Sequence, residues 1–222
     1  MTREQPPQRT NGLRIVVMSD THELHREVNA PEGDILLFCG DFTMWSKSMA
    51  AILDFNAWLG ELPYRRIVLS PGNHEFFLER DPTARSLLTN ATVLINESVT
   101  VAGLNIWGSP VTPLSSGAFS LSSAIDRKRL YAAIPADTDV LITHTPPYGV
   151  LDLSPGSTQP AGCKELSDAV QRIRPKLHVF GHIHGAHGVA HTDDTTFVNA
   201  ALLGADGDLE HQPVVLQMRR NG

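Results

Sequence analysis

The chain has 222 residues, 41% hydrophobic and 19% charged, and its 18 Lys and Arg against 24 Asp and Glu give a formal net charge of −6. A chain of this size and composition can bury a sizeable core, which excludes intrinsic disorder for its bulk. The acidic balance argues against stable binding of nucleic acid and against docking on an anionic membrane, and no run of 18 apolar residues could span a bilayer.

Residues 1–12 contain prolines and arginines but no apolar stretch, so they are expected to form a disordered tail rather than a signal peptide. The two cysteines are Cys39, at the end of an apolar run, and Cys163. Without an export signal they favour a cytoplasmic protein with reduced thiols. No internal repeat or linker is visible, so residues 13–222 are predicted to form one domain.

Short apolar runs bounded by Gly, Pro or Asp predict buried strands of an α/β protein at residues 14–19, 35–39, 66–70, 139–143 and 177–180. Helices are predicted between them at residues 46–62, 122–133 and 162–173, where apolar residues such as Ile52, Phe55 and Leu59 recur at helical spacing. The β-rich stretches 92–108, 189–198 and 214–218 indicate that the sheets include antiparallel strands.

The informative feature is the side chains that follow the five predicted strands. The motifs are Asp20-Thr21-His22, Gly40-Asp41, Gly72-Asn73-His74, Thr143-His144 and Gly181-His182-Ile183-His184. Strand ends at one edge of an α/β sheet converge on one crevice, so these side chains are predicted to meet there. Their nitrogen and oxygen ligands exceed what one tetrahedral metal needs, but they suit two metals that share a carboxylate. Two such ions are the usual arrangement for displacement at phosphorus.

The order D-x-H, G-D, G-N-H-E, H and G-H-x-H resembles the calcineurin-like metallophosphoesterase superfamily. Within it the chain looks most similar to the metallophosphoesterase-domain-containing brain protein family and its bacterial relatives. The shared stretches are residues 40–43, 72–75, 108–113, 143–147 and 174–181. This resemblance implies a four-layer α/β/β/α sandwich of two mixed sheets flanked by helices.

The resemblance also implies roles for the residues. One metal would be held by Asp20, His22 and His184, the other by Asn73, His144 and His182, with Asp41 bridging the two. His74 would not be a ligand; with Asn73 it would contact the substrate phosphate, and it would stabilise the transition state or protonate the leaving group. Glu75 is assigned no chemistry. The donor set suits Mn, Fe, Zn or Co.

Departures from related subclasses favour a phosphodiesterase that acts through metal-activated hydroxide, with small cyclic or linear nucleotides (2′,3′- or 3′,5′-cyclic) as substrates. Protein phosphatases carry an Arg after the bridging Asp, whereas this chain has Thr43-Met44-Trp45-Ser46. Mammalian members of the most similar family have glycine at the position of His182, so an intact His182 predicts a complete dinuclear centre. A phosphomonoesterase and a low-activity nucleotide-binding regulatory protein remain alternatives, a nuclease is a weaker one, and a homodimer is left open.

The remaining histidines and tryptophans have simpler interpretations. His178 is expected in the core, whereas His25, His187, His191 and His211 are expected to be exposed, with His25 and His187 close enough to touch substrate. Trp58 and Trp107 are expected to pack in the interior, and Trp45 is the only tryptophan with a candidate substrate role. Residues 109–122 are interpreted as either a loop near the cleft or a surface spacer.

Overall fold

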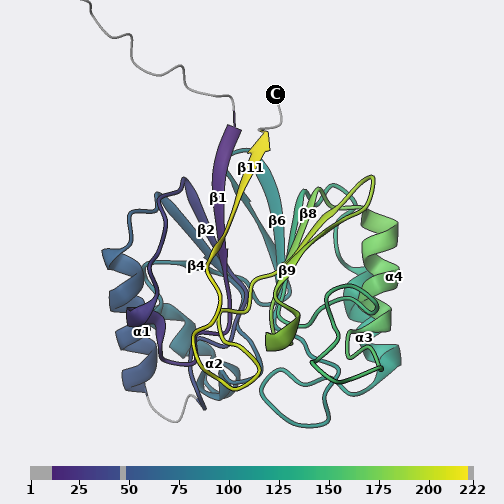
Figure 1. The fold of residues 1–222 in the computed structure, drawn as a ribbon, viewed down its shortest axis with the longest axis horizontal. Coiled ribbons are helices and arrows are strands. Elements are labelled where there is room, and N and C mark those ends of the chain that lie inside the picture. Colours follow the sequence, from purple (N-terminus) through teal and green to yellow (C-terminus); the bar gives the residue numbers. More distant parts are fainter. Residues whose placement is uncertain (1–11, 46–48, 220–222) are drawn as a thin grey trace, which may run out of the picture.

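The computed structural model describes residues 12–45 and 49–219, which form two mixed sheets flanked by helices (Figure 1). The first sheet has the strand order β11-β1-β2-β3-β4 and the second the order β5-β6-β7-β8-β10-β9. The strands of the first sheet are β1 (Gly12–Met18), β2 (Ile35–Phe38), β3 (Arg66–Leu69), β4 (Thr92–Val93) and β11 (Val214–Arg219). Those of the second are β5 (Glu97–Val101), β6 (Leu104–Ser109), β7 (Val140–Thr143), β8 (Leu177–Phe180), β9 (Gly188–His191) and β10 (Thr196–Asn199).

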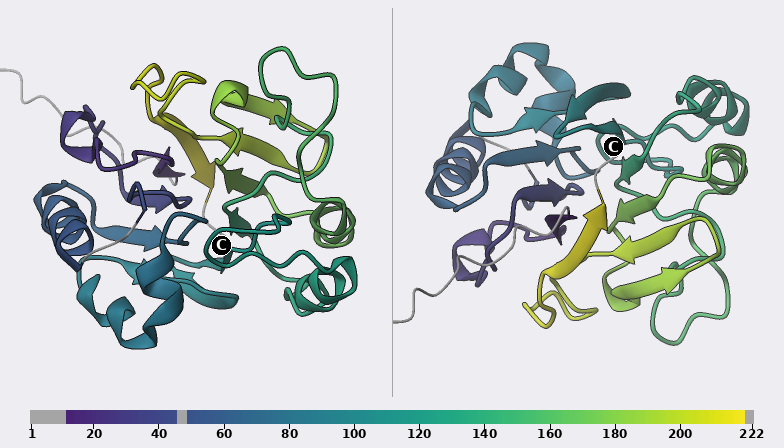
Figure 2. Two further views of the ribbon diagram at one scale, coloured as in Figure 1. Left: turned by 90° about the horizontal axis from the view of Figure 1, so that it is seen from below. Right: turned by 90° about the horizontal axis from the view of Figure 1, so that it is seen from above.

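The described residues form four α-helices. These helices cover the outer faces of the sheets, as the views along the strands in Figure 2 show. They are α1 (Met49–Glu61), α2 (Phe76–Arg80), α3 (Ala124–Ala132) and α4 (Lys164–Ile173), and short 3-10 turns lie at His25–Glu27, Pro82–Leu87 and His184–Ala186. Helices α1 and α2 lie on the first sheet, and α3 and α4 lie on the second. Among the described residues, no helix is long and apolar enough to cross a bilayer.

The alternation of side chains along each strand builds three apolar layers. Ile15 and Val17 of β1 point into the layer between the sheets, where they pack with residues such as Ile142 of β7. Their neighbours Val16 and Met18 point to the opposite face and pack with α1. Because successive side chains of a strand face opposite sides, strands buried on both faces read as continuous apolar runs. A third layer lies between the second sheet and helices α3 and α4. The predicted four-layer sandwich is therefore confirmed.

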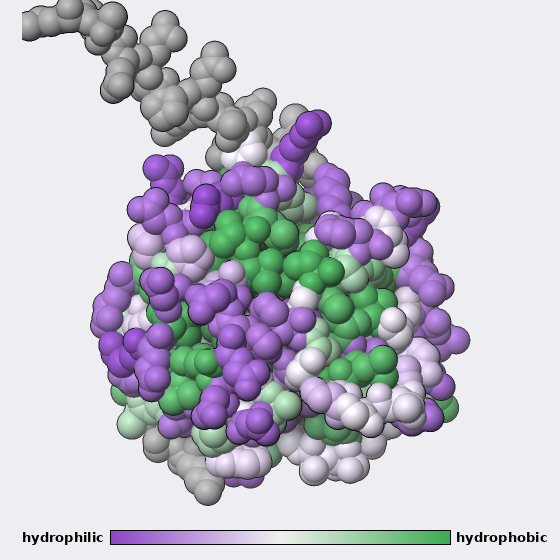
Figure 3. All heavy atoms as spheres, viewed as in Figure 1, coloured by the Kyte–Doolittle hydropathy of each residue, from purple (hydrophilic) through white to green (hydrophobic). Residues whose placement is uncertain are grey.

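The five apolar runs each form the predicted strand, and the three helices begin and end close to their predicted bounds. In the first sheet β1, β2, β3 and β4 are parallel, whereas β11 pairs antiparallel with β1. The predicted tail lies outside the described residues except for Gly12, with which β1 begins. The first three residues of the first predicted helix also lie outside them. On the face drawn in Figure 3, hydrophobic residues gather over the central region where β11 runs, and hydrophilic residues surround them.

Candidate metal centre

The predicted site residues gather where the carboxyl ends of strands from both sheets meet. Asp20, Asp41 and Asn73 follow β1, β2 and β3 of the first sheet, whereas His144 and His182 follow β7 and β8 of the second. A bridge between Ser19 and Ala201 joins the chain after β1 to the chain after β10 and holds the two edges together. Neither sheet alone contains the whole set, so the site depends on the packing of one sheet against the other.

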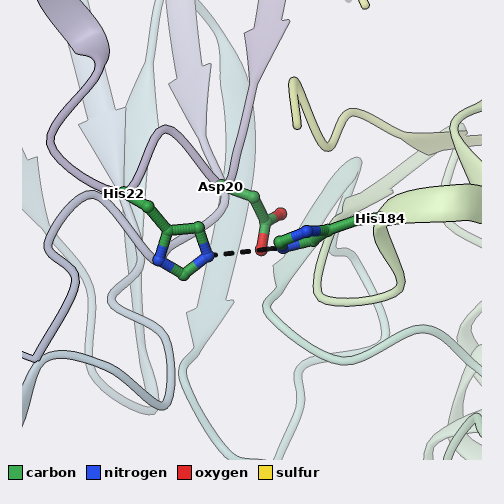
Figure 4. A group of neighbouring side chains, drawn as sticks. All are labelled: Asp20, His22 and His184. Carbon is green, nitrogen blue, oxygen red and sulfur yellow. Dashed lines mark hydrogen bonds and ion pairs between the residues drawn. The ribbon is translucent and has the colours of Figure 1, made fainter. Parts of the chain in front are cut away.

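One cluster consists of Asp20, His22 and His184, whose ligand atoms all lie within 4.8 Å of one another. The Nε2 atom of His184 lies 3.3 Å from Oδ1 of Asp20 and 3.3 Å from Nε2 of His22. Figure 4 shows the carboxylate and the two imidazole rings turned toward one another, although His184 is 162 residues from His22 in sequence.

A second cluster consists of Asp41, His144 and His182, again with ligand atoms within 4.8 Å of one another. The Nε2 atom of His144 lies 3.1 Å from Oδ2 of Asp41 and 2.9 Å from Oδ1 of Asn73. The same Oδ2 of Asp41 lies 3.8 Å from Nε2 of His22 in the first cluster. Asp41 therefore stands between the two clusters.

His74 lies at the mouth of this arrangement. Its Nε2 is 3.9 Å from Oδ2 of Asp41, and its ring meets the His22 ring edge-on at a centroid distance of 4.6 Å. Its Nδ1 is hydrogen-bonded to the carbonyl oxygen of Met44. His22, Asp41 and His74 form a third group close enough to hold an ion, so the geometry leaves His74 able either to bind metal or to face a substrate.

Unusual backbone conformations place these side chains. Asp20, His22, Asp41 and His182 are non-glycine residues with positive φ, at 54°, 40°, 54° and 69°. Such conformations cost free energy and cluster at functional sites, where the surrounding structure imposes them. Glycines allow the close approach that results: a Cβ on Gly72 would lie 2.3 Å from Oδ1 of Asp41, and one on Gly181 would lie 2.0 Å from Oδ2 of Asp20.

The donor set fits metal ions because acceptor atoms face one another. The Nδ1 of His22 donates to the carbonyl of Thr43 at 3.1 Å, and the Nδ1 of His144 donates to that of Cys39 at 2.8 Å. When the imidazole is neutral and its proton is on Nδ1, the Nε2 atom carries a lone pair, which points into the cluster. The lone pair of His144 then meets oxygens of Asp41 and Asn73, an arrangement that a cation would relieve.

In the metal-free protein, protons take the place of that cation. Burial disfavours the charged form of His144, yet the charge of Asp41 and the hydrogen bond to it raise its pKa to about 10. Burial likewise works against ionisation of Asp41, but the surrounding imidazoles, led by His144, hold its pKa well below the usual range. For His182 burial dominates and lowers the pKa to about 4. The pocket therefore keeps the Asp41 carboxylate ionised by placing positive charge beside it.

Glu75, for which the sequence suggests no chemistry, fixes the loops that carry the site. Its buried carboxylate accepts hydrogen bonds from the backbone N–H groups of Asp41 at 2.9 Å, Thr43 at 3.0 Å and Gly72 at 2.6 Å, and from the Thr43 hydroxyl at 2.9 Å. It joins the loop after β2 to the loop after β3 and so sets the position of Asp41 relative to Asn73. The signal in the sequence is its place between His74 and an apolar run that begins at Phe76, but that pattern alone does not reveal its partners.

The other histidines only partly match expectation. His178 is buried as predicted, with its Nε2 2.9 Å from the Thr143 hydroxyl. The prediction that His25 is exposed is wrong: it is 1% exposed because its Nε2 bonds Asp54 at 3.0 Å and its ring packs on Phe55 and Trp58. His191 is exposed as predicted. His187 and His211 are less exposed than predicted: both are half-buried, because their rings stack on each other at a centroid distance of 4.4 Å.

Two of the tryptophans, Trp58 and Trp107, are buried as predicted. Trp45 is 51% exposed and lies beside His74. The segment 109–122 lies near the cleft, because the N–H of Ala118 donates to the carbonyl of Asn73 at 2.8 Å. Cys39 and Cys163 are both buried free thiols.

A cavity of about 400 Å³ opens onto both clusters and His74. Its lining residues are His22, Asp41, Met44, Asn73, His74, His182, His184, Leu203, Ala205, Asp206 and Gly207. Of the described residues that line it, none is Lys or Arg.

Comparison with solved structures supports the fold. The crystal structure of TT1561 from Thermus thermophilus is similar with a TM-score of 0.60 over 85% of this chain and 88% of that chain, at 14% identity. A dimetal phosphatase from Danio rerio is similar with a TM-score of 0.55 over 86% of this chain and 87% of that chain, at 12% identity. At these identities the likeness shows the fold alone.

Comparison of sequences shows the family. UPF0046 protein K07C11.7 of Caenorhabditis elegans is 35% identical over 225 residues, which cover 95% of this chain and 77% of that protein. Metallophosphoesterase domain-containing protein 1 of Homo sapiens is 36% identical over 238 residues, which cover 96% of this chain and 73% of that protein. Residues 13–186 match the family model described as calcineurin-like phosphoesterase. The chain therefore belongs to the calcineurin-like phosphoesterase family.

Proposed function

We propose that the protein is a phosphodiesterase that uses two metal ions. The observation that carries this proposal is the position of Asp41, whose Oδ2 lies 3.8 Å from His22 of one cluster and 3.1 Å from His144 of the other. One carboxylate between two sets of N and O donors suits a pair of ions that share a ligand, and membership of the family supports the same conclusion.

The residues divide into two ligand sets around this shared carboxylate. Asp20, His22 and His184 would hold one ion, and Asn73, His144 and His182 the other. When bound, the ions supply positive charge for the phosphoryl oxygens and lower the pKa of the attacking water. Nitrogen and oxygen donors without thiolate suit Mn, Fe, Zn or Co.

His74 is the residue best placed to act on the ester oxygen. Because its Nδ1 is hydrogen-bonded to the Met44 carbonyl, its Nε2 is left for the cavity. In its protonated form the imidazole presents an N–H at this atom, which can donate to a phosphoryl oxygen or transfer the proton to the departing alkoxide. The same pairing fixes the orientation of the ring at the mouth of the site.

The charges that line the cavity favour diesters over monoesters. Asp41 and Asp206 line it, whereas none of its described lining residues is Lys or Arg. A monoester dianion is best held by a bidentate Arg, and a diester carries only one negative charge. We therefore propose small phosphodiesters as the substrate class, with cyclic nucleotides as candidates.

The test compares Mn-loaded protein on bis(4-nitrophenyl) phosphate and on 4-nitrophenyl phosphate, beside a chelator-treated sample. We expect turnover that the chelator abolishes and that is faster for the diester. A faster monoester reaction would refute the diesterase proposal. Absence of turnover with two metals demonstrably bound would refute the enzymatic role and favour nucleotide binding instead.

A further inference from the structure

Trp45 occupies a position that core packing does not explain. It lies in the loop after β2 and is 51% exposed, whereas Trp58 and Trp107 are 5% and 3% exposed. Its ring lies 4.5 Å from the His74 ring with an interplanar angle of 31°. The preceding residue, Met44, is 43% exposed and lines the cavity. A large apolar side chain therefore stands open to solvent beside the candidate proton donor.

The surroundings of Trp45 point to a ligand of particular chemistry. An exposed indole ring can stack on a planar ring of a ligand. Such stacking depends little on the identity of the ligand ring. Asp206 lines the cavity that the neighbours of Trp45, Met44 and His74, also line, and none of the described lining residues is Lys or Arg. A second phosphate on the ligand would thus meet a carboxylate and find no cation among these residues, so a ligand with a single phosphate is favoured.

We infer that Trp45 is a specificity-determining residue, whose exposed ring stacks on a planar heterocycle carried by the alcohol that is esterified to the reacting phosphate. This inference rests on the proposed diesterase function. It names the preferred substrate as a phosphodiester with one phosphate and a planar heterocycle, such as a single nucleotide, rather than a polynucleotide or a pyrophosphate. His74 then contacts the phosphoester, and Trp45 contacts the heterocycle of the same substrate.

A kinetic comparison tests this inference with two substrates that share the reacting group. Both 2′,3′-cyclic AMP and glycerol 1,2-cyclic phosphate contain a five-membered cyclic diester, but only the former carries a base. In Trp45→Leu, which keeps apolar bulk, we expect KM for 2′,3′-cyclic AMP to rise roughly tenfold more than KM for glycerol 1,2-cyclic phosphate. Trp45→Phe should retain most of the preference. Ile125→Ala on α3, where Ile125 is 73% exposed, serves as the control and should behave like the wild type.

A second measurement does not depend on turnover. Because Trp58 and Trp107 are buried, quenching of the fluorescence by acrylamide reports mainly on Trp45. With Zn-loaded protein, 5′-AMP should shield this fluorescence from acrylamide, whereas ribose 5-phosphate, which has the same phosphate without a base, should not. The Trp45→Phe variant should show no shielding signal.

The outcomes separate the two proposals. If both cyclic diesters are hydrolysed, but Trp45→Leu affects them equally and 5′-AMP does not shield Trp45, the role of Trp45 is refuted and the diesterase function stands. If 5′-AMP shields Trp45 while neither diester is hydrolysed, the diesterase function is refuted and the stacking site stands.

Discussion

The Gly72→Ala substitution tests how little space the packing around the candidate metal centre leaves for its ligands to move. A Cβ at this position would lie 2.3 Å from Oδ1 of Asp41, 2.7 Å from its backbone nitrogen and 2.8 Å from Cε1 of His144. Separations under 3.0 Å essentially never occur for a real Cβ, so the Asp41 carboxylate would have to move by about 0.7 Å. Its Oδ1 accepts a hydrogen bond from the backbone N–H of His74 at 2.9 Å, which this movement would weaken.

The size of the effect follows from these contacts. Overpacking a rigid interior costs about 1–3 kcal/mol, so the free energy of unfolding of metal-free protein should fall by that amount. A ligand displaced by this distance, or deprived of its supporting hydrogen bond, loses on the order of 10- to 100-fold in metal affinity or activity. Urea unfolding, metal content and diester turnover at saturating Mn²⁺ measure the three quantities.

The control for this substitution is Gly103→Ala in the turn between β5 and β6. Gly103 has a φ of 83°, and no atom lies within 4 Å of the point that a Cβ would occupy, so alanine there brings backbone strain without touching the site. That variant should lose about 1 kcal/mol of stability and keep its turnover. Wild-type turnover and metal content in Gly72→Ala would mean that the centre accommodates a displaced Asp41, contrary to this prediction.

Three further predictions concern individual histidines. His144→Ala should retain a cooperative unfolding transition but lose at least about 100-fold in diester turnover, because one ligand set loses its central Nε2; unchanged turnover would remove His144 from the site. Although burial opposes it, Asp41 raises the pKa of His144 to about 10, so Zn²⁺ must displace a proton. Affinity for Zn²⁺ should therefore increase with pH below about 10, and calorimetry in buffers of different ionisation enthalpy should detect proton release; a pH-independent affinity would contradict this. Burial lowers the pKa of His178 from 6.5 to about 3, so as pH falls below 6.5 the unfolded chain takes up the proton first and stability is lost. Between about pH 7 and pH 5, the free energy of unfolding of His178→Phe should therefore fall by about 2 kcal/mol less than that of the wild type. Equal decreases in the two proteins would argue against a neutral buried imidazole.

Much of the fold could be predicted because its strands are buried on both faces. The runs at residues 35–39 and 177–180 are apolar nearly throughout, and a short continuous run flanked by Gly identifies such a strand without any knowledge of its partners. Exposed faces and short elements carry weaker patterns. Helix α2 (Phe76–Arg80) could not be predicted, because five residues are too few to show a helical period.

The side-chain environment of particular residues could not be predicted in the same way. His25 looks like an ordinary surface histidine in sequence, yet α1 supplies the Asp54 carboxylate and the aromatic rings that bury it. Glu75 looks like an incidental neighbour of His74, yet its partners Asp41 and Thr43 lie 34 and 32 residues away in sequence. Contacts of this kind join distant segments, so no local pattern reports them.

The metal-binding chemistry of this protein is visible in short sequence motifs, in which Asp, Asn and His side chains come just after apolar strands. Strand propensity and the presence of side chains that can bind metal are properties of short segments, so each segment can be interpreted without knowledge of the others. Three relations are visible only once the chain is folded: Asp41 lies between two clusters, Glu75 joins the loops after β2 and β3, and Trp45 is exposed beside His74. Those relations depend on how one sheet packs against the other, and packing is a property of the whole chain.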